Sequence, residues 1–339
     1  MREMTRKARA KINLGLDVIG RFPNGYHDLR MVMQTVDLCD ELILRASDEG
    51  GDGSIRLLLK QDTSVSSGEE LIPADESNLA CRAARMLMDE FGVRKDLEIV
   101  LKKQIPAAAG LAGGSADAAA VFKGVNELFA LGLGEQELRE RGVKIGADVP
   151  YCIMGGTALA EGIGERLTRL PDAPQAYVLL VKPPICVSTK YVYSSLDSLD
   201  SFDLREANSD GRSVLPLAGR HPTLRAGYPP TAGRGRFRDG QIVFHPDIDG
   251  EVQAIRGGDF SRMAALMGNV LESVTIPAFP VVGEIKERML IRGAVNAMMS
   301  GSGPTVFGLF DDRGKAERAY ADFSGEESLN EVFLTTFWP

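Results

Sequence analysis

The chain has 339 residues, and 39 Lys and Arg against 47 Asp and Glu give it a formal net charge of −8. Apolar residues make up 44% and charged residues 25%, values typical of globular proteins, so the composition excludes a disordered or collagen-like chain. An acidic chain also lacks the broad basic face of a general nucleic-acid binder, so no nucleic acid is expected as a partner.

Alternating polarity predicts a β-rich beginning. We expect a strand over residues 8–19, further strands over residues 29–44 and another over residues 55–59. The polar, Gly- and Ser-containing residues 47–53 are typical of a hairpin tip. From residue 78 the period changes, because Asn78 is a good helix N-cap and the apolar residues Leu79, Ala83, Leu87 and Phe91 share one helix face.

A strand is next expected over residues 97–101, followed by a small-residue loop and an alanine-rich helix over residues 115–130. Strands followed by a mixed segment indicate an α+β fold rather than strict βαβ alternation. Two prolines near residues 170–176 and the length of the chain favour two domains, residues 1–170 and 171–339. The second is expected to hold strands over 177–181 and 306–310 and helices over 259–271 and 279–292.

An insertion is predicted at about residues 196–245. Residues 209–240 within it contain six Gly, four Pro and six Arg but only two Asp, a composition typical of a long surface loop.

Several site classes lack a sequence signal. The four cysteines (Cys39, Cys81, Cys152 and Cys186) are far apart in apolar contexts, which favours buried thiols over disulfides or a zinc ribbon. The three histidines have no metal-binding spacing. Seven charged residues among the first 20 argue against a signal peptide, and no run of about 18 apolar residues predicts a membrane span. We therefore expect a soluble, cytoplasmic protein with no membrane partner, and no signal specifies an oligomeric state.

The segment that joins the predicted strand and helix is rich in small residues, with glycines at 110, 113 and 114. Small residues let backbone N–H groups approach a ligand, and a helix N-terminus adds partial positive charge, so such a loop can hold a di- or triphosphate. It is neither a Walker A loop nor a G-x-G-x-x-G fingerprint, and a tight connection that binds nothing is the alternative. A second small-residue loop, residues 299–305, precedes the strand at 306–310. The presence of two such loops in one chain favours a site for an anionic ligand that both loops border.

An acid–base pair is also a candidate. Asp148 lies between small and apolar residues, where a carboxylate can take a proton from an alcohol if a cation keeps it ionised. Lys11 is the cation inside the apolar first strand, so it is either an edge residue with its amine in water or a functional ammonium.

Taken together, these motifs resemble the GHMP small-molecule kinase superfamily, named after galactokinase, homoserine, mevalonate and phosphomevalonate kinases. The matching segments are residues 10–14, 24–29, 105–120, 146–150 and 299–309. They extend over nearly the whole chain apart from the insertion. Because residues 25–27 read Gly-Tyr-His, the resemblance is strongest to the members that phosphorylate a cytidine-diphosphate sugar alcohol in the non-mevalonate isoprenoid pathway.

The resemblance implies a two-domain kinase with its active site in the inter-domain cleft and an N-terminal domain that binds ATP. Asp148 would be the general base for the 2-hydroxyl of the substrate, and Lys11 would orient Asp148 and stabilise the incipient alkoxide. Mg²⁺ would bridge the ATP phosphates, held largely by the nucleotide and water rather than by a protein metal site. Asn78 would contact the adenine end, although a plain helix cap is nearly as good an explanation. The phosphate loop would consist of Pro106, Ala107, Ala108, Ala109, Gly110, Leu111, Ala112, Gly113, Gly114, Ser115 and Ala116.

The expected partner is a small-molecule cytidine diphosphate. Tyr26 and Tyr193 would give the base two aromatic faces, and His27 would read its hydrogen-bonding edge. Asn13 would face the sugar alcohol and Lys11. The remaining substrate-binding candidates are Thr189, Gly301, Ser302 and Gly303.

The chain departs from the family pattern in the phosphate loop. Ala108, Ala109 and Ala112 stand where many relatives have glycine, and Ala116 stands where a second serine is frequent. The added methyl groups restrict the backbone but leave its N–H groups in place, so they bear on ATP affinity rather than on the type of reaction. Two alternatives remain: another GHMP kinase, acting on homoserine, mevalonate or a sugar, or a non-catalytic nucleotide-binding relative for which the basic insertion is a docking surface.

Overall fold

The computed structural model describes residues 2–48, 50–61, 72–200, 234–238, 241–329 and 331–339. Its strands are β1 (Arg2–Arg21), β2 (His27–Ala46), β3 (Ile55–Gln61), β4 (Leu97–Lys103), β5 (Thr157–Gly162), β6 (Arg166–Arg169), β7 (Tyr177–Lys182), β8 (Arg234–Arg238), β9 (Gln241–His245), β10 (Gly268–Asn269), β11 (Asn296–Met299), β12 (Val306–Phe310) and β13 (Glu331–Thr336). Its helices are α1 (Leu79–Glu90), α2 (Gly113–Leu128), α3 (Glu135–Gly142), α4 (Val149–Met154), α5 (Thr189–Asp200), α7 (Ile248–Arg256), α8 (Phe260–Leu266), α9 (Glu272–Ala278), α10 (Pro280–Ile291) and α11 (Arg313–Ser324). Helices and mixed sheets together confirm the predicted α+β class.

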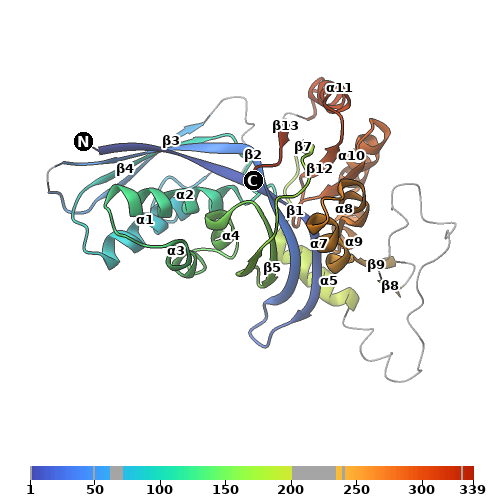
Figure 1. Cartoon of the computed structure of the whole chain (residues 1–339), viewed down its shortest axis with the longest axis horizontal. Helices are drawn as coiled ribbons and strands as arrows, with labels where there is room; N and C mark the ends of the chain where they lie inside the picture. Colours follow the sequence, from blue (N-terminus) through green and yellow to red (C-terminus); the bar gives the residue numbers. More distant parts are fainter. Residues whose placement is uncertain (1, 49, 62–71, 201–233, 239–240, 330) are drawn as a thin grey trace.

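Two main sheets organise the chain (Figure 1). The first has the order β10-β1-β2-β4-β3, with β5 and β6 added where β2 continues beyond β4. The second has the order β11-β12-β7-β13, and β7 is the first of its strands along the chain. Because β10 comes from the C-terminal half yet pairs in parallel with β1, the two halves of the chain share the first sheet. The division into domains at residue 170 stays a prediction.

The long β1–β2 hairpin forms the centre of the first sheet. Helices α1 and α2 lie against one face of this sheet (Figure 1). Their buried alanines and leucines share one core cluster with apolar residues of β2 and β4. Residues 10–18 of β1 are buried without alternation, because the chain covers both faces of the strand there. A polar side chain within this run must therefore find partners inside the protein.

Several sequence predictions were wrong in detail. Residues 29–44 belong to the single strand β2, and the segment 47–53 is no hairpin tip, because β4 lies between β2 and β3. The helix predicted over 259–271 ends at Leu266, since the chain then turns extended and adds β10 to β1. Helices α3, α4, α5, α7, α9 and α11 were not predicted.

The thiol and insertion predictions were wrong in part. The four cysteines are free, as expected, but only Cys81 is buried; Cys39 and Cys152 are half-buried, and Cys186 is exposed because it follows β7 on a surface connection. Of the insertion at 196–245, residues 196–200 end α5, and β8 pairs with β9 as an antiparallel ribbon rather than a loop. Residues 201–233, with His221, lie outside the described residues. No helix in the described ranges is long and apolar enough to cross a bilayer.

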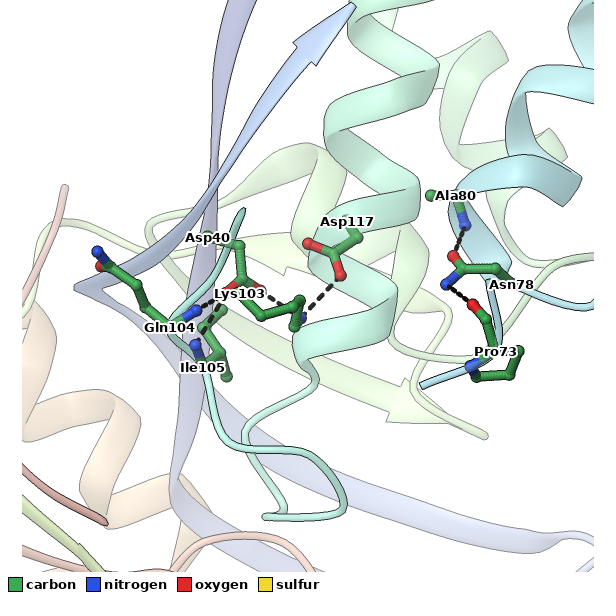
Figure 2. A network of polar contacts seen from close by, with 8 residues as sticks. All are labelled: Asp40, Pro73, Asn78, Ala80, Lys103, Gln104, Ile105 and Asp117. Carbon is green, nitrogen blue, oxygen red and sulfur yellow. Dashed lines mark hydrogen bonds and ion pairs between the residues drawn. The ribbon is translucent and has the colours of Figure 1, made fainter. Parts of the chain in front are cut away.

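A buried polar network joins the two elements that flank the small-residue loop (Figure 2). Lys103, the last residue of β4, donates to Asp40 of β2 and, at 2.8 Å, to Asp117 in the first turns of α2. Asp40 also accepts the backbone N–H groups of Gln104 and Ile105 at 2.6 and 2.8 Å. The network thereby attaches both ends of the loop to β2.

The charge of this network depends on pH. Burial, reinforced by the nearby Asp40 carboxylate, raises the pKa of Asp117 to about 7, and the Lys103 ammonium offsets this only in part. In the unfolded chain an aspartate titrates near its usual value of about 4. Between these two values the folded protein binds more protons than the unfolded chain, so this carboxyl's contribution to the free energy of unfolding falls as pH rises.

We therefore expect Asp117→Asn to gain stability relative to the unmodified protein as the pH rises from 5 to 8, because the amide cannot ionise. Thermal unfolding of both proteins at several pH values measures the difference in Tm. The same change at the exposed Asp172 is the control. A difference in Tm that stays constant across this pH range would contradict the shifted titration of Asp117.

Candidate active site

A cavity of about 610 Å³ collects most of the predicted functional side chains. Its lining comes from β1, the β1–β2 connection, the start of β2, the loop before α2 with the first turn of that helix, the loop before α4, the β5–β6 turn, helix α5 and the β11–β12 connection. Twelve predicted site residues line it: Lys11, Asn13, Tyr26, His27, Gly110, Ala112, Ser115, Asp148, Thr189, Tyr193, Gly301 and Ser302. Segments from both halves of the chain thus surround one cavity.

Lys11 and Asn13 reach the cavity from the doubly covered part of β1. Both side chains are almost fully buried, at 5% and 1% exposure. The Lys11 ammonium donates to Asn13 Oδ1 at 2.8 Å and lies 3.8 Å from Asp148 Oδ2. A buried ammonium needs such partners, so the edge-residue interpretation of Lys11 is wrong for this structure.

Asp148 is presented by a tight turn directly before α4. Val149 N–H donates to Gly146 O at 3.2 Å, and Cys152 N–H donates to Asp148 O at 3.0 Å. Although Asp148 occupies the N-cap position, its side chain makes no capping hydrogen bond. Its carboxylate is therefore available to the cavity, where its side chain is 34% exposed.

The loop before α2 is joined to the neighbouring elements by its backbone. Leu111 O accepts from Lys11 N–H at 3.1 Å, so the loop lies directly on β1 beside the acid–base pair. Ala108 and Ala112 adopt left-handed backbone conformations with φ of 48° and 57°. Alanine carries a cost of about 1–2 kcal/mol in that region, so these two methyl groups strain the loop where glycine would not.

The two small-residue loops contact each other. Ser300 Oγ donates to Gly110 O at 3.0 Å, and a Cβ added to Gly110 would lie only 2.2 Å from Ser300 O. Asn269 of β10 donates to the carbonyl oxygens of Met299 and Gly301, both at 2.8 Å. The position of the first loop is thus linked through the second to β10 and β1.

Other predicted residues lie outside the cavity lining. Asn78 caps α1, because its Oδ1 accepts from Ala80 N–H at 2.9 Å and its Nδ2 donates to Pro73 O at 2.8 Å (Figure 2). The helix-cap alternative is confirmed, while an adenine contact stays a prediction. The remaining residues outside the lining are Pro106, Ala107, Ala108, Ala109, Leu111, Gly113, Gly114, Ala116 and Gly303. The buried side chains in this set are those of Pro106, Ala109, Leu111 and Ala116, and these residues can offer a ligand only their backbone groups.

The three ring residues predicted to hold the base all line the cavity. Tyr26, in the β1–β2 connection, is 60% exposed. The rings of His27 and Tyr193 lie 4.6 Å apart between centroids, tilted by 32°. Burial, with a smaller effect from the Asp148 carboxylate, raises the pKa of Tyr193, so its phenol stays neutral. Because His27 occupies one face of Tyr193, a base can stack only on the other face in this arrangement.

Three charged residues of the cavity were missed by the sequence analysis: Arg21, Lys190 and Asp197. Asp197 Oδ1 lies 2.7 Å from His27 Nε2, and its Oδ2 lies 3.0 Å from an Arg21 nitrogen. The helical period contained a usable signal, because Tyr193 and Asp197 are four residues apart and share one face of α5. That face was missed because no helix was expected over residues 189–200.

Two family models match separate parts of the chain. The model of the GHMP kinases N terminal domain matches residues 78–156, which include the phosphate loop and Asp148. The model of the GHMP kinases C terminal domain matches residues 252–327, which include the second small-residue loop.

Whole-chain relatives and a solved structure agree with these models. The chain is 46% identical over its whole length to the full length of the 4-diphosphocytidyl-2-C-methyl-D-erythritol kinase of Lachnospira eligens. It is 42% identical to the enzyme of that name from Lachnoclostridium phytofermentans, over 98% of this chain and 96% of the relative. A crystal structure of 4-(cytidine 5'-diphospho)-2C-methyl-D-erythritol kinase superposes with a TM-score of 0.71 at 26% identity, over 99% of this chain and 100% of the other. These similarities confirm the resemblance seen in the motifs, and the chain belongs to the GHMP kinase family.

Proposed function

We propose that this protein transfers the γ-phosphoryl group of ATP to the 2-hydroxyl of 4-diphosphocytidyl-2-C-methyl-D-erythritol, yielding the 2-phosphate and ADP. The observation that carries the proposal is the Lys11–Asp148 pair, 3.8 Å apart, in a cavity that Gly110, Ser115 and His27 also line. Relatives with that name match the chain from end to end at 46 and 42% identity.

Asp148 is the general base of the proposed reaction. Its carboxylate takes the proton of the 2-hydroxyl while the hydroxyl oxygen forms a bond to the γ-phosphorus and the bond from that phosphorus to ADP breaks. The Lys11 ammonium stabilises the charge that develops on the attacking oxygen, and Asn13 holds the ammonium in place through the 2.8 Å hydrogen bond. Most of the rate acceleration comes from holding the two substrates in line.

The phosphate loop supplies the ATP site. Its backbone N–H groups and the N-terminus of α2 favour phosphate oxygens, so an acidic protein can hold a triphosphate without a broad basic surface. Within the described ranges, no group of three His, Cys, Asp or Glu side chains is placed to hold a metal ion. Mg²⁺ is proposed to be carried by the ATP phosphates and water, and the Ser115 hydroxyl, which lines the cavity, would offer it an oxygen ligand.

The α5 side of the cavity supplies the proposed cytidine-diphosphate site. Tyr26 and Tyr193 provide aromatic surface for the base, and stacking of this kind contributes about 1–3 kcal/mol per base in single-strand binding systems. Arg21 and Lys190 add cations that suit a diphosphate. Thr189 and Ser302, whose hydroxyl oxygens lie 2.9 Å apart, offer further donors.

The direct test is a steady-state assay of ADP release with ATP, Mg²⁺ and 4-diphosphocytidyl-2-C-methyl-D-erythritol. We expect substrate-dependent ADP well above the ATPase background and competition by cytidine nucleotides. ADP release that does not depend on the substrate rejects the proposal. Turnover without competition by cytidine nucleotides would favour another GHMP kinase activity.

Asp148→Asn and Lys11→Ala are expected to fold normally and to lose at least about two orders of magnitude in kcat, the lower end for acid–base catalysis. The loss arises because one variant has no proton acceptor and the other has no ammonium beside the attacking oxygen. Single-turnover and steady-state rates measure it, with circular dichroism and Tm as controls for folding. Near-normal rates in both variants would remove the pair from these roles.

Gly110→Ala is expected to raise the KM for ATP by at least about tenfold. Its φ of 75° is unfavourable for alanine, and the new Cβ would lie 2.2 Å from Ser300 O, so the phosphate loop must move. Gly132→Ala is the matched control, because Gly132 has a φ of 74° but no atom within 4 Å of its added Cβ. Equal effects of the two changes on KM would mean that the contact between the loops does not position the ATP site.

A further inference from the structure

The side chain of His27 is held by two neighbours on α5. Its Nε2 lies 2.7 Å from Asp197 Oδ1, and its ring stacks on Tyr193 at a centroid distance of 4.6 Å. The His27 side chain is only 13% exposed. These two contacts fix both the position and the plane of an imidazole that lines the cavity.

The contact with Asp197 also determines which ring nitrogen carries the hydrogen. An ionised carboxylate only accepts hydrogen bonds, so His27 Nε2 must be the donor. A neutral imidazole has one N–H, which leaves Nδ1 as an acceptor. Within the part of the chain that the structure describes, no other group hydrogen-bonds to Nδ1, so this lone pair is available to a ligand in the cavity.

Arg21 keeps Asp197 suited to this role. A nitrogen of its guanidinium lies 3.0 Å from Asp197 Oδ2, while its Nε donates to Gly25 O at 3.2 Å in the β1–β2 connection. This ion pair engages the second carboxylate oxygen, so Asp197 is held from both sides while its Oδ1 faces His27 Nε2. It also holds Asp197 and the connection that bears Tyr26, directly before His27, against each other.

We propose that Asp197 is a positioning residue that sets base specificity: by keeping Nε2 protonated, it presents His27 Nδ1 as an acceptor for the exocyclic amino group of cytosine. Uracil carries a carbonyl oxygen at that position, so two acceptors would then face each other. A site built to accept from an amino group rejects the analogue that lacks it, because the acceptor is left unpaired. This inference rests on the proposed function and extends it from the choice of substrate to the residue that enforces it.

The test compares binding of cytidine 5′-diphosphate (CDP) and uridine 5′-diphosphate (UDP) by isothermal titration calorimetry at pH 8. The unmodified protein is expected to prefer CDP by at least about tenfold, which corresponds to about 1.4 kcal/mol. In Asp197→Asn the amide can donate or accept, and in Asp197→Ala no partner remains, so neither variant enforces one tautomer. We expect the preference to fall to about threefold or less in both, mainly through weaker CDP binding.

Asp172→Ala, which removes an exposed carboxylate outside the cavity, is the control and should leave the CDP preference unchanged. An unchanged preference in both Asp197 variants overturns the inference and leaves the proposed kinase activity standing. Absence of CDP binding to the unmodified protein overturns the inference and counts against the proposed function as well.

A spectroscopic measurement tests the tautomer itself. In protein labelled with ¹⁵N-histidine, His27 is assigned by loss of its signals in His27→Gln, and its two ring nitrogens report where the hydrogen lies. We expect a protonated Nε2 and an unprotonated Nδ1 in the unmodified protein, and a mixture of tautomers in Asp197→Asn. A protonated Nδ1 with an unprotonated Nε2 in the unmodified protein would overturn the inference, since a purely structural Asp197 would not require either form.

Discussion

The site depends on one constraint, which is that a lysine lies on a strand buried on both faces. Along residues 10–18 of β1 no side chain can reach solvent freely, so the Lys11 ammonium needs acceptors inside the protein. Asn13 on the same strand and Asp148 on the turn before α4 are the two that it finds. Burial therefore brings a cation and a carboxylate together, and it does so in the cavity that the phosphate loop borders.

The phosphate loop is held in position by contacts with neighbouring segments of the chain. Lys103, Asp40 and Asp117 attach its two ends to β2, Lys11 N–H bonds to Leu111 O, and Ser300 bonds to Gly110 O (Figure 2). These contacts explain how a loop with alanine at two left-handed positions keeps its conformation, because the surrounding hydrogen bonds offset a strain of about 1–2 kcal/mol at each. The N–H groups of the loop are thus arranged before any phosphate arrives.

Helix α5 links the C-terminal half of the chain to the side of the cavity that Tyr26 and His27 line. Thr189, Tyr193 and Asp197 succeed one another along one face of this helix, and they contact, respectively, Ser302, the His27 ring and His27 Nε2. His27, the first residue of β2, is consequently held by residues from the other half of the chain. The proposed recognition of a base in this cavity would therefore depend on how the two halves meet.

By itself the sequence determined the fold class, the kinase family, and most of the residues that line the cavity, because small-residue loops and a Tyr-His pair are local features with their own chemistry. Its local patterns did not determine that Lys11 is buried against Asp148, a pairing that only the family resemblance implied, nor that Asp197 lies at His27, since those partners are separated by 137 and 170 residues. The pairing of β10 with β1 and the contact between the two loops were likewise absent from the local pattern. Only the tertiary structure decided them, because contacts between distant segments follow from how sheets and helices pack and leave no period in the sequence.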